Sequence, residues 1–329
     1  MLYYILFKFN RNQFYYYIYI IMSINNKVSN KYKIKNKNKP KNRHKNSNKK
    51  TRKFKQSNCA PSPSNNYTCY SDKSLYKLRD FWNIRHPDVK IISDDTKYIW
   101  EQLKKNMINV CDTERCWLRQ KFISNNMDSS LLTYTFAPDS PPTWKTNINE
   151  WLSSTDIENV MKQYENKFSN FVFIGPSPID FDTRVEQGEC VWDELCNFNL
   201  INFLQNGKNK IGMIFNTDTH DKDGSHWVSM FIDIKKKFIF YFDSNGNKPQ
   251  KEIIILQNRI KQQGKMLGID FIIDSNYPKE HQKSSTECGM YSLYFISNLI
   301  KDEKMPNFFK THTILDCTME NLRTKYFNQ

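Results

Sequence analysis

The sequence predicts an α+β fold in which helices flank a mixed central sheet and a helical region precedes that sheet. Two observations support this class. Short apolar runs with the length of strands lie between residues 171 and 274, and a longer apolar run with the length of a helix follows at 288–300. In residues 72–135, apolar side chains recur every three to four positions, which is the period of a helix.

The first 71 residues carry the excess positive charge of the chain. The 329 residues have a net charge of +15, and residues 1–71 hold 16 of the 49 basic residues and no acidic ones. We predict that 1–71 is a disordered tail, because the Lys/Asn tract of 25–58 cannot bury enough apolar surface to offset its ordering entropy. Two interpretations of this tract stay open: contact with nucleic acid or anionic lipid through counterion release, and a solvated tail or an address label.

An apolar leader occupies residues 2–21, but polar residues at position 8 and at positions 10–13 divide it. Neither half approaches the roughly 20 residues of a membrane span. The leader also lacks the small-residue cleavage site of a signal peptide. We therefore predict no transmembrane segment, and we interpret 1–21 as upstream sequence or a disordered leader. A segment that lies on a membrane surface is the alternative.

Residues 72–140 are predicted to form a helical accessory domain. Leu75, Leu78 and Trp82 have helical spacing, as do Ile99 and Leu103. A Pro-rich patch at residues 137–142 is typical of a linker. We therefore place the catalytic domain at 141–329.

The predicted catalytic domain begins with a helix capped by Ser or Thr and ending near Phe168. A short buried strand at 171–175 comes next. The remaining elements are predicted as strands at 211–216, 226–232 and 237–243, a helix at 252–263, a strand at 269–274, and helices at 288–300 and 313–327.

The second and third strands of the domain bring a histidine and a carboxylate together. If they form a hairpin centred between Ile234 and Lys235, His226 faces Asp243 and Trp227 faces Phe242. Both faces of this hairpin are apolar, so we expect it to be central in the sheet. A carboxylate beside a histidine fixes the tautomer of the imidazole and stabilises its protonated form. The pair is therefore a candidate base with its orienting acid.

A candidate nucleophile follows. Cys288 lies at the start of a predicted helix, where the helix dipole favours a thiolate, and Gly289 would let a substrate approach closely. Gln282 could donate a hydrogen bond to an oxyanion formed on the substrate. His281 is a rival base, which we discount because no carboxylate is placed to orient it. Each residue by itself is more typical of a structural role; the prediction rests on their joint order.

Four of the other cysteines form two close pairs, Cys111 with Cys116 and Cys190 with Cys196. The remaining three are Cys59 and Cys69 in the tail and Cys317 near the end of the sequence. We expect buried thiols rather than a disulfide scaffold, because the chain is long and the cysteines are sparse. A zinc site at the close pairs is the alternative, but no histidine lies nearby. We therefore expect a reducing compartment, no metal and no cofactor.

The ordered set His226-Trp227, Asp243 and Gln282-x5-Cys288-Gly289 resembles the signature of the SUMO-specific protease and adenovirus endopeptidase superfamily of cysteine proteases. Within it, the helical region before the domain and residues 321–327 resemble the African swine fever virus polyprotein-processing protease and its relatives in giant DNA viruses. The resemblance implies a Ulp1/adenain-like core with Cys288 as nucleophile, His226 as base, Asp243 as orienter and Gln282 as oxyanion donor.

The resemblance also implies a function and a substrate. It implies a viral thiol protease that cleaves a structural polyprotein after Gly-Gly sites, in the virion and in the host cytoplasm during assembly. Trp151 and Trp227 are candidates for substrate contact, although Trp227 alone is typical of a core aromatic. Two alternatives stay open. One is an isopeptidase that removes ubiquitin or SUMO, which is disfavoured because Ser153-Ser154 replaces the family's usual Asn-Asp. The other is a non-enzymatic, nucleic-acid-binding virion protein.

Overall fold

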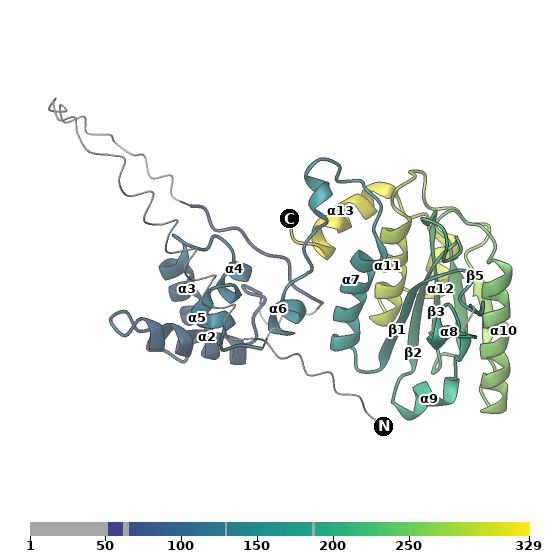
Figure 1. Ribbon diagram of the computed structural model, residues 1–329, viewed down its shortest axis with the longest axis horizontal. Coiled ribbons are helices and arrows are strands. Elements are labelled where there is room, and N and C mark those ends of the chain that lie inside the picture. Colours follow the sequence, from purple (N-terminus) through teal and green to yellow (C-terminus); the bar gives the residue numbers. More distant parts are fainter. Residues whose placement is uncertain (1–51, 62–65, 129, 186–187) are drawn as a thin grey trace, which may run out of the picture. The chain divides into compact units, whose positions relative to one another are not determined.

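The computed structural model describes residues 52–61, 66–128, 130–185 and 188–329 (Figure 1). Residues 52–329 form one compact unit. The predictions made for the leader and for most of the Lys/Asn tract fall outside the described residues. Among the residues that are described, no helix is long and apolar enough to cross a membrane.

A five-stranded mixed sheet lies at the centre of the catalytic region, in the order β1-β2-β3-β4-β5. The outer pairs β1–β2 and β4–β5 are parallel, whereas β2–β3 and β3–β4 are antiparallel. The hairpin is therefore central, as its two apolar faces predicted. The strands are β1 (Phe171–Pro178), β2 (Lys210–Asn216), β3 (Trp227–Asp233), β4 (Phe238–Phe242) and β5 (Ile272–Ser275).

Helices cover both faces of this sheet, which confirms the predicted α+β class. α7 (Ser154–Lys167) and α11 (Cys288–Ile300) pack on one face, where Phe231 and Phe240 meet them. α10 (Lys251–Met266) packs on the other face, so that the sheet lies between these helices (Figure 1). The shorter elements of this region are η1 (Pro142–Lys145), α8 (Asp193–Cys196), α9 (Leu200–Gln205), α12 (Pro306–Thr311) and α13 (Asp316–Tyr326).

The local signals explain where the helices begin. Ser153 caps α7 by accepting from the backbone N–H of Asp156, and the Asp156 carboxylate accepts from the backbone N–H of Ser153. Such a capping box stabilises a helix start by about 1 kcal/mol. This contact gives Ser153 a structural role of its own. α11 is buried along nearly all its length and therefore lacks a polar face, which agrees with its continuous apolar sequence.

The predicted register of the β3–β4 hairpin is wrong by two residues. Phe242 pairs with Ser229 rather than with Trp227, and Asp233 pairs with Phe238. The turn therefore covers residues 234–237 and is centred one position later than expected. The Asp233 carboxylate accepts from the backbone N–H of Lys236, and Lys237 adopts φ 58°, so side-chain bonding within the turn sets the register. A shift of two residues keeps every side chain on its predicted face.

β5 also differs from its prediction, because it begins three residues later than the expected 269–274 and carries exposed Ile272. Phe271, just before it, is buried against Gly264 of α10. The apolar residues at 269–271 thus belong to the connection that packs under α10. Their hydrophobicity reflects packing on the helix and does not mark a strand.

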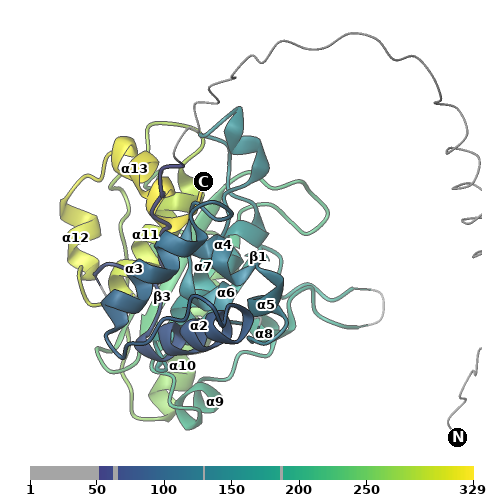
Figure 2. The same cartoon turned by 90° about the vertical axis from the view of Figure 1, so that its left-hand side faces the viewer.

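The region before residue 141 is helical, as its periodicity predicted (Figure 2). Its buried side chains form a core of their own. Leu75, Leu78, Ile99, Leu103 and Trp117 are buried in this core. The boundary placed at residue 140 stays a prediction. The helices are α2 (Asp72–Arg85), α3 (Thr96–Met107), α4 (Glu114–Leu118), α5 (Lys121–Ser124) and α6 (Ser130–Thr135).

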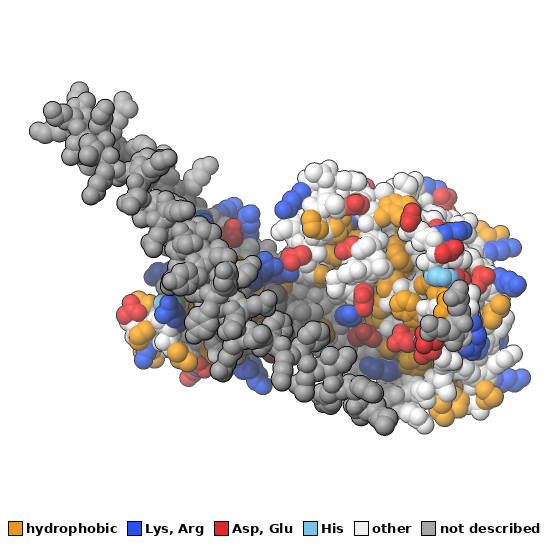
Figure 3. Space-filling model, in the orientation of Figure 1, with side chains coloured by type: hydrophobic (Ala, Val, Ile, Leu, Met, Phe, Trp, Pro, Cys, Tyr) orange, Lys and Arg blue, Asp and Glu red, His pale blue; other side chains and the backbone are white. Residues whose placement is uncertain are grey.

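Part of the predicted disordered tail is packed. Tyr70 is fully buried and stacks on Trp117, and Phe54 packs against the same cluster. Residues 52–61 and 66–71 therefore belong to the folded part, because the aromatic side chains of Phe54, Tyr67 and Tyr70 provide apolar surface for burial, including at the end of the Lys/Asn tract. Over the visible face of the described residues, acidic and basic side chains are interspersed (Figure 3).

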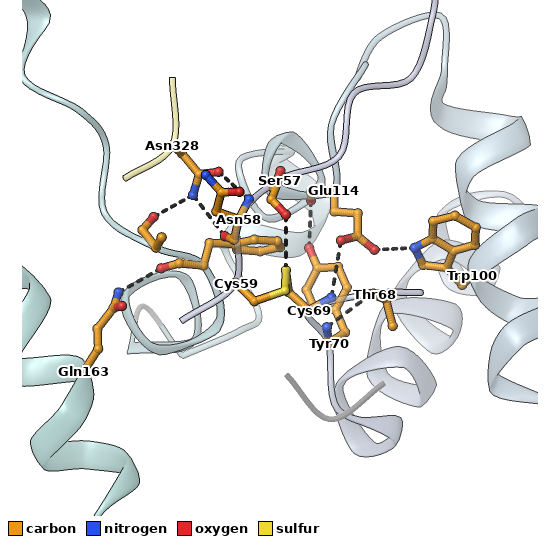
Figure 4. Close-up of a disulfide and its surroundings, with 12 residues drawn as sticks. Ser57, Asn58, Cys59, Thr68, Cys69, Tyr70, Trp100, Glu114, Gln163 and Asn328 are labelled. Atoms are coloured by element: carbon orange, nitrogen blue, oxygen red, sulfur yellow. Dashed lines mark hydrogen bonds between the residues drawn. A yellow bond between two sulfur atoms is a disulfide. The ribbon is translucent and has the colours of Figure 1, made fainter. Parts of the chain in front are cut away.

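The Pro-rich patch that was predicted to be a linker is held by hydrogen bonds to Asn328. Asn328 near the C-terminus donates its backbone N–H to the Pro138 carbonyl, and its carbonyl accepts from the Ser140 N–H, both at 2.8 Å. Its side chain donates to the Ala137 carbonyl at 2.7 Å and to the Asn58 carbonyl at 3.1 Å (Figure 4). These bonds satisfy backbone groups that proline residues leave without a regular partner.

The expectation of buried thiols is wrong for six of the eight cysteines. The structure contains the disulfides Cys59–Cys69, Cys111–Cys116 and Cys190–Cys196, with Cα–Cα distances of 5.1, 5.4 and 6.3 Å. The Cys69 sulfur lies 3.7 Å from the carbonyl oxygen of Ser57 (Figure 4). The close spacing of two of these pairs therefore marks short disulfide loops. Within the described residues, no group of His, Cys, Asp and Glu has the arrangement of a metal site.

Candidate active site

His226 and Asp243 form a hydrogen-bonded pair at the adjacent ends of β3 and β4. His226 immediately precedes β3, and Asp243 immediately follows β4. The His226 Nε2 and Asp243 Oδ1 atoms are 2.7 Å apart. The pair forms despite the shifted register, because the two residues remain on one face and their side chains meet diagonally.

The electrostatic surroundings of His226 favour its protonated form. Burial by itself lowers the pKa of this imidazole, but the hydrogen bonds and charges of Asp243 and Cys288 outweigh burial and raise the pKa to about 9. The His226 side chain is 16% exposed, and the Asp243 side chain 1%. A protonated imidazole beside a thiol is the arrangement that activates a cysteine nucleophile.

Asn276 holds the backbone of Asp243, and the sequence analysis missed it. Its side-chain oxygen accepts from the Asp243 N–H at 2.9 Å, and its amide donates to the carbonyls of Asp243 and Lys279, both at 2.7 Å. Asp243 Oδ1 also accepts from the backbone N–H of Asn245 at 2.9 Å. These contacts fix the carboxylate from behind. An asparagine in a loop carries no sequence signal for such a role, because its partner lies 33 positions away.

Cys288 is the first residue of α11 and is 1% exposed. Because it lies at the N-terminus of a 13-residue helix, the helix dipole favours negative charge on its sulfur. Its interaction with His226 is one of the causes that raise the pKa of the imidazole. The structure therefore brings together the candidate base, the candidate orienting acid and the candidate nucleophile, which lie at three separate positions in the sequence.

Gly289 has a packing role that the sequence analysis did not foresee. A Cβ atom at this position would lie 3.1 Å from the Leu152 Cβ and 3.3 Å from the Trp227 ring. Trp227 in turn donates its indole N–H to the Leu152 carbonyl at 2.9 Å. The glycine thus lets the start of α11 pack closely against Leu152 and Trp227.

Gln282 lies in the loop before α11, and its side-chain amide is oriented from both ends. Its Oε1 accepts from the Ser244 hydroxyl at 2.7 Å, and its Nε2 donates to the Ser284 carbonyl at 2.6 Å. Ser244 follows Asp243 directly, and its carbonyl accepts from the Gln282 N–H at 2.9 Å. An amide has two N–H donors, and the Ser284 contact occupies one of them. Ser244 is a second residue that sequence analysis missed.

His281 is placed as a structural residue. It is 1% exposed, its Nε2 lies 2.9 Å from the Phe309 carbonyl, and its Nδ1 accepts from the Ile314 N–H at 3.2 Å. Burial is the main reason why its pKa is lowered, so it stays neutral. Both ring nitrogens of His281 contact backbone groups, which agrees with the expectation that His281 is not the base.

The two tryptophans predicted to contact substrate have different surroundings. Trp151 is 40% exposed, whereas Trp227 is 7% exposed and packs in the core between the sheet and α11. Trp227 therefore supports the position of Leu152 from behind. Of the two, only Trp151 presents its ring to solvent.

Next to Cys288 lies a buried ion pair that the sequence did not suggest. Arg323 of α13 and Glu287 are 0% and 1% exposed, and their Nη2 and Oε1 atoms are 2.9 Å apart. Burial raises the pKa of Glu287, and the hydrogen bond and charge of Arg323 offset part of this rise. The pair therefore sets the charge at the residue that precedes the thiol.

Comparison with known proteins places this arrangement in a family. Residues 207–329 match the C-terminal catalytic domain of the Ulp1 protease family. A thiol protease of Acanthamoeba polyphaga mimivirus is 33% identical over 249 residues, which cover 73% of this chain and 78% of that protein. The chain belongs to the Ulp1 protease family. It is a viral thiol protease, a cysteine endopeptidase, which excludes the non-enzymatic alternative.

Two African swine fever virus proteins are also similar. One, named a cysteine protease, and another, named a SUMO-1 cysteine protease, are each 26% identical over 286 residues, covering 82% of this chain and 95% of theirs. The crystal structure of the African swine fever virus protease matches the fold with a TM-score of 0.59 at 24% identity, covering 82% of this chain and 95% of that one. The structural similarity thus extends over the helical region as well as the sheet.

Proposed function

We propose that Cys288 is the nucleophile of this protease, His226 its general base and acid, Asp243 the residue that orients His226, and Gln282 an oxyanion donor. The observation that carries this proposal is the 2.7 Å bond between His226 and Asp243, together with the contact of the same imidazole with Cys288 at the start of α11.

The proposed reaction passes through a thioester. The Cys288 thiolate attacks the scissile carbonyl carbon, and the carbonyl oxygen becomes an oxyanion. His226 then donates a proton to the departing amine, the C–N bond breaks, and the acyl group remains on sulfur. In the second half, neutral His226 takes a proton from water, the resulting hydroxide attacks the thioester, and the thiolate leaves. Asp243 stabilises the imidazolium in both halves.

The oxyanion would be held by the Gln282 side chain and the Cys288 backbone N–H. A donor that is already oriented stabilises the transition state without reorganisation, and loss of one such donor typically lowers the rate by about 10²–10³-fold. The contacts of Gln282 with Ser244 and Ser284 support this role, because they hold the amide in one orientation.

The substrate that we propose is a viral structural polyprotein, cut after Gly-Gly sites in the virion or in the host cytoplasm during assembly. The similarity to viral proteases over most of the chain supports a viral polypeptide substrate. Packing of Gly289 against Leu152 and Trp227 narrows the space beside the thiol, which favours small residues before the scissile bond. Nucleic-acid contact by residues 25–58 remains a separate hypothesis about the tail.

The test compares two kinds of substrate on the full chain. A peptide with a Gly-Gly site and a ubiquitin-like conjugate are each incubated with the enzyme and with Cys288→Ala. We expect cleavage after Gly-Gly and no activity in the variant. Preferential cleavage of the conjugate would identify an isopeptidase, an alternative that the name of one African swine fever virus relative favours. If a peptide with bulky residues before the scissile bond were cleaved as fast as the Gly-Gly peptide, the Gly-Gly proposal would be contradicted.

A labelling experiment tests the nucleophile independently of the substrate. A peptide vinyl sulfone should modify Cys288 in preference to exposed Cys317, and His226→Ala should abolish this preference. Labelling of both cysteines at the same rate in the native enzyme would contradict the assignment of Cys288.

A further inference from the structure

A single arginine connects three segments around the proposed nucleophile. Arg323 donates from Nε to both carboxylate oxygens of Glu287, at 3.1 and 3.0 Å, and from Nη2 to one of them at 2.9 Å. Its Nη1 donates to the Glu150 carbonyl at 2.8 Å, and its guanidinium carbon lies 4.8 Å from the centre of the Trp144 ring. Glu287 precedes Cys288 in the chain, and Glu150 precedes Trp151.

The Glu287 carboxylate creates an electrostatic problem that Arg323 solves. Glu287 is the N-cap of α11, yet its side chain makes no capping bond to the helix. A carboxylate buried there without a partner would repel a thiolate on the next residue and would offset the stabilisation that the helix dipole gives to that thiolate. The fork of Arg323 neutralises this charge and binds both oxygens, a geometry that lysine cannot reproduce.

We propose that Arg323 is a positioning residue for catalysis, which neutralises Glu287 beside the thiolate and fixes the segment that carries Trp151. The inference rests on the proposed role of Cys288 and adds a residue from the last helix of the chain to the site. The bond to the Glu150 carbonyl also holds the backbone directly before Trp151, whose exposed ring is the candidate for substrate contact. One side chain would thus act on both the nucleophile and the substrate surface.

The titratable groups around Cys288 allow a specific prediction. Those that face it or its partners are His226 and Asp243 from the sheet, Glu287 and Tyr291 on or before α11, and Asp316, Glu320 and Arg323 on α13. Of these, the Glu287–Arg323 pair is the only one in which each member can be neutralised alone without removing a proposed catalytic residue. The two single changes alter the charge beside Cys288 in opposite directions.

The experiment measures the rate of iodoacetamide labelling of Cys288 against pH in the full chain, with the labelled residue quantified by mass spectrometry. Arg323→Gln should move the midpoint of this profile to higher pH, by about one pH unit, because the Glu287 charge is exposed to the thiolate. Glu287→Gln should move the midpoint to lower pH. The double variant Glu287→Gln/Arg323→Gln should return it close to that of the unmodified protein.

Two further variants separate positioning from simple stability. Lys325→Gln removes the same charge from an exposed position of α13 and should leave the profile unchanged. Arg323→Lys keeps the charge but loses the fork and the bond to Glu150, so the labelling midpoint should stay near its original value while KM rises more than kcat falls. Thermal unfolding of each variant shows that it is folded at the assay temperature.

The opposite shifts distinguish the inference from a structural role. If the profiles of the folded Arg323→Gln and Glu287→Gln variants coincide with that of the unmodified protein, or shift in the same direction, the inference is overturned. Should Arg323→Gln fail to fold, the downward shift of Glu287→Gln remains the deciding measurement. Labelling needs no substrate, so retention of proteolysis in Cys288→Ala would contradict the proposed function separately.

Discussion

His226 and Asp243 are bound at 2.7 Å although they are not direct cross-strand neighbours. Each lies one residue beyond the end of its strand. Asn276 binds the backbone N–H and carbonyl of Asp243, so this residue is held in place while the imidazole of His226 stays partly exposed. Rigid support of one partner and partial exposure of the other suit a base that must meet a substrate.

The alkaline limit of activity should follow the pKa of His226. This pKa is raised from its ordinary value to about 9, so the protonated form persists until about pH 9 and kcat/KM should fall above it. In Asp243→Asn, the carboxylate that raises the pKa of His226 is lost while burial still lowers this pKa. The alkaline limit should therefore move to lower pH, and the maximal rate should fall. Asp270→Asn, an exposed acidic control, should leave the profile unchanged. An unmoved limit in Asp243→Asn would exclude this origin.

Stability should depend on pH in the matching direction. A histidine whose pKa is higher in the folded state than its ordinary value of 6.5 stabilises the fold below that value, and the contribution is lost as the pH rises through about 9. The unfolding free energy of the unmodified chain, relative to that of His226→Gln, should therefore decrease from pH 6 to pH 9.5. Urea unfolding at the two pH values measures it, and a constant difference would contradict the raised pKa.

Gln282 and Ser244 should affect turnover more than binding. Gln282→Ala removes the proposed oxyanion donor and should lower kcat by about 10²–10³-fold with little change in KM. Ser244→Ala keeps the Gln282 side chain but removes the hydroxyl that donates to its Oε1, so a smaller loss of kcat is expected. Gln262→Ala on the exposed side of α10 is the matched control. A loss confined to KM in Gln282→Ala would argue against an oxyanion role.

Replacing Asn276 should reduce both stability and turnover. Asn276→Ala leaves buried backbone groups of Asp243 without partners, which costs roughly 1–3 kcal/mol. Because Asp243 would also lose its support, kcat should fall even at temperatures where the variant is folded. Chemical unfolding and steady-state kinetics measure the two effects, and Asn202→Ala on the surface serves as the control. Reduced stability with normal kcat would limit Asn276 to a structural role.

The disulfides can be counted directly. Alkylation of the unfolded, non-reduced chain should label Cys288 and Cys317, which are the two free cysteines, and reduction should raise the number of labelled residues to the eight in the chain. Replacing Cys59 and Cys69 together should lower the unfolding free energy by about 2–3 kcal/mol, whereas Cys317→Ser should have little effect. Labelling of Cys59 without reduction would show that this bridge is absent.

Several features of this protein follow from the sequence by itself. The continuous apolar run predicted the helix at 288–300, and the apolar residues on both faces predicted the central position of the hairpin, because segments buried on all sides carry no polar face. The types and order of His226, Asp243 and Cys288 predicted that these three residues would come together, since a base, an orienting acid and a thiol form a recognisable set. These signals are local, or they are carried by the identity of single residues.

The tertiary structure decided the rest. The bonding of Asp233 within its turn set the hairpin register, and no periodicity could show a shift that preserves both faces. Asn276 acts on Asp243 across 33 positions, and Arg323 reaches Glu287 across 36 positions and Glu150 across 173. Such contacts depend on which segments meet after folding. A buried arginine and an exposed one look alike in the sequence, because only packing removes one of them from water.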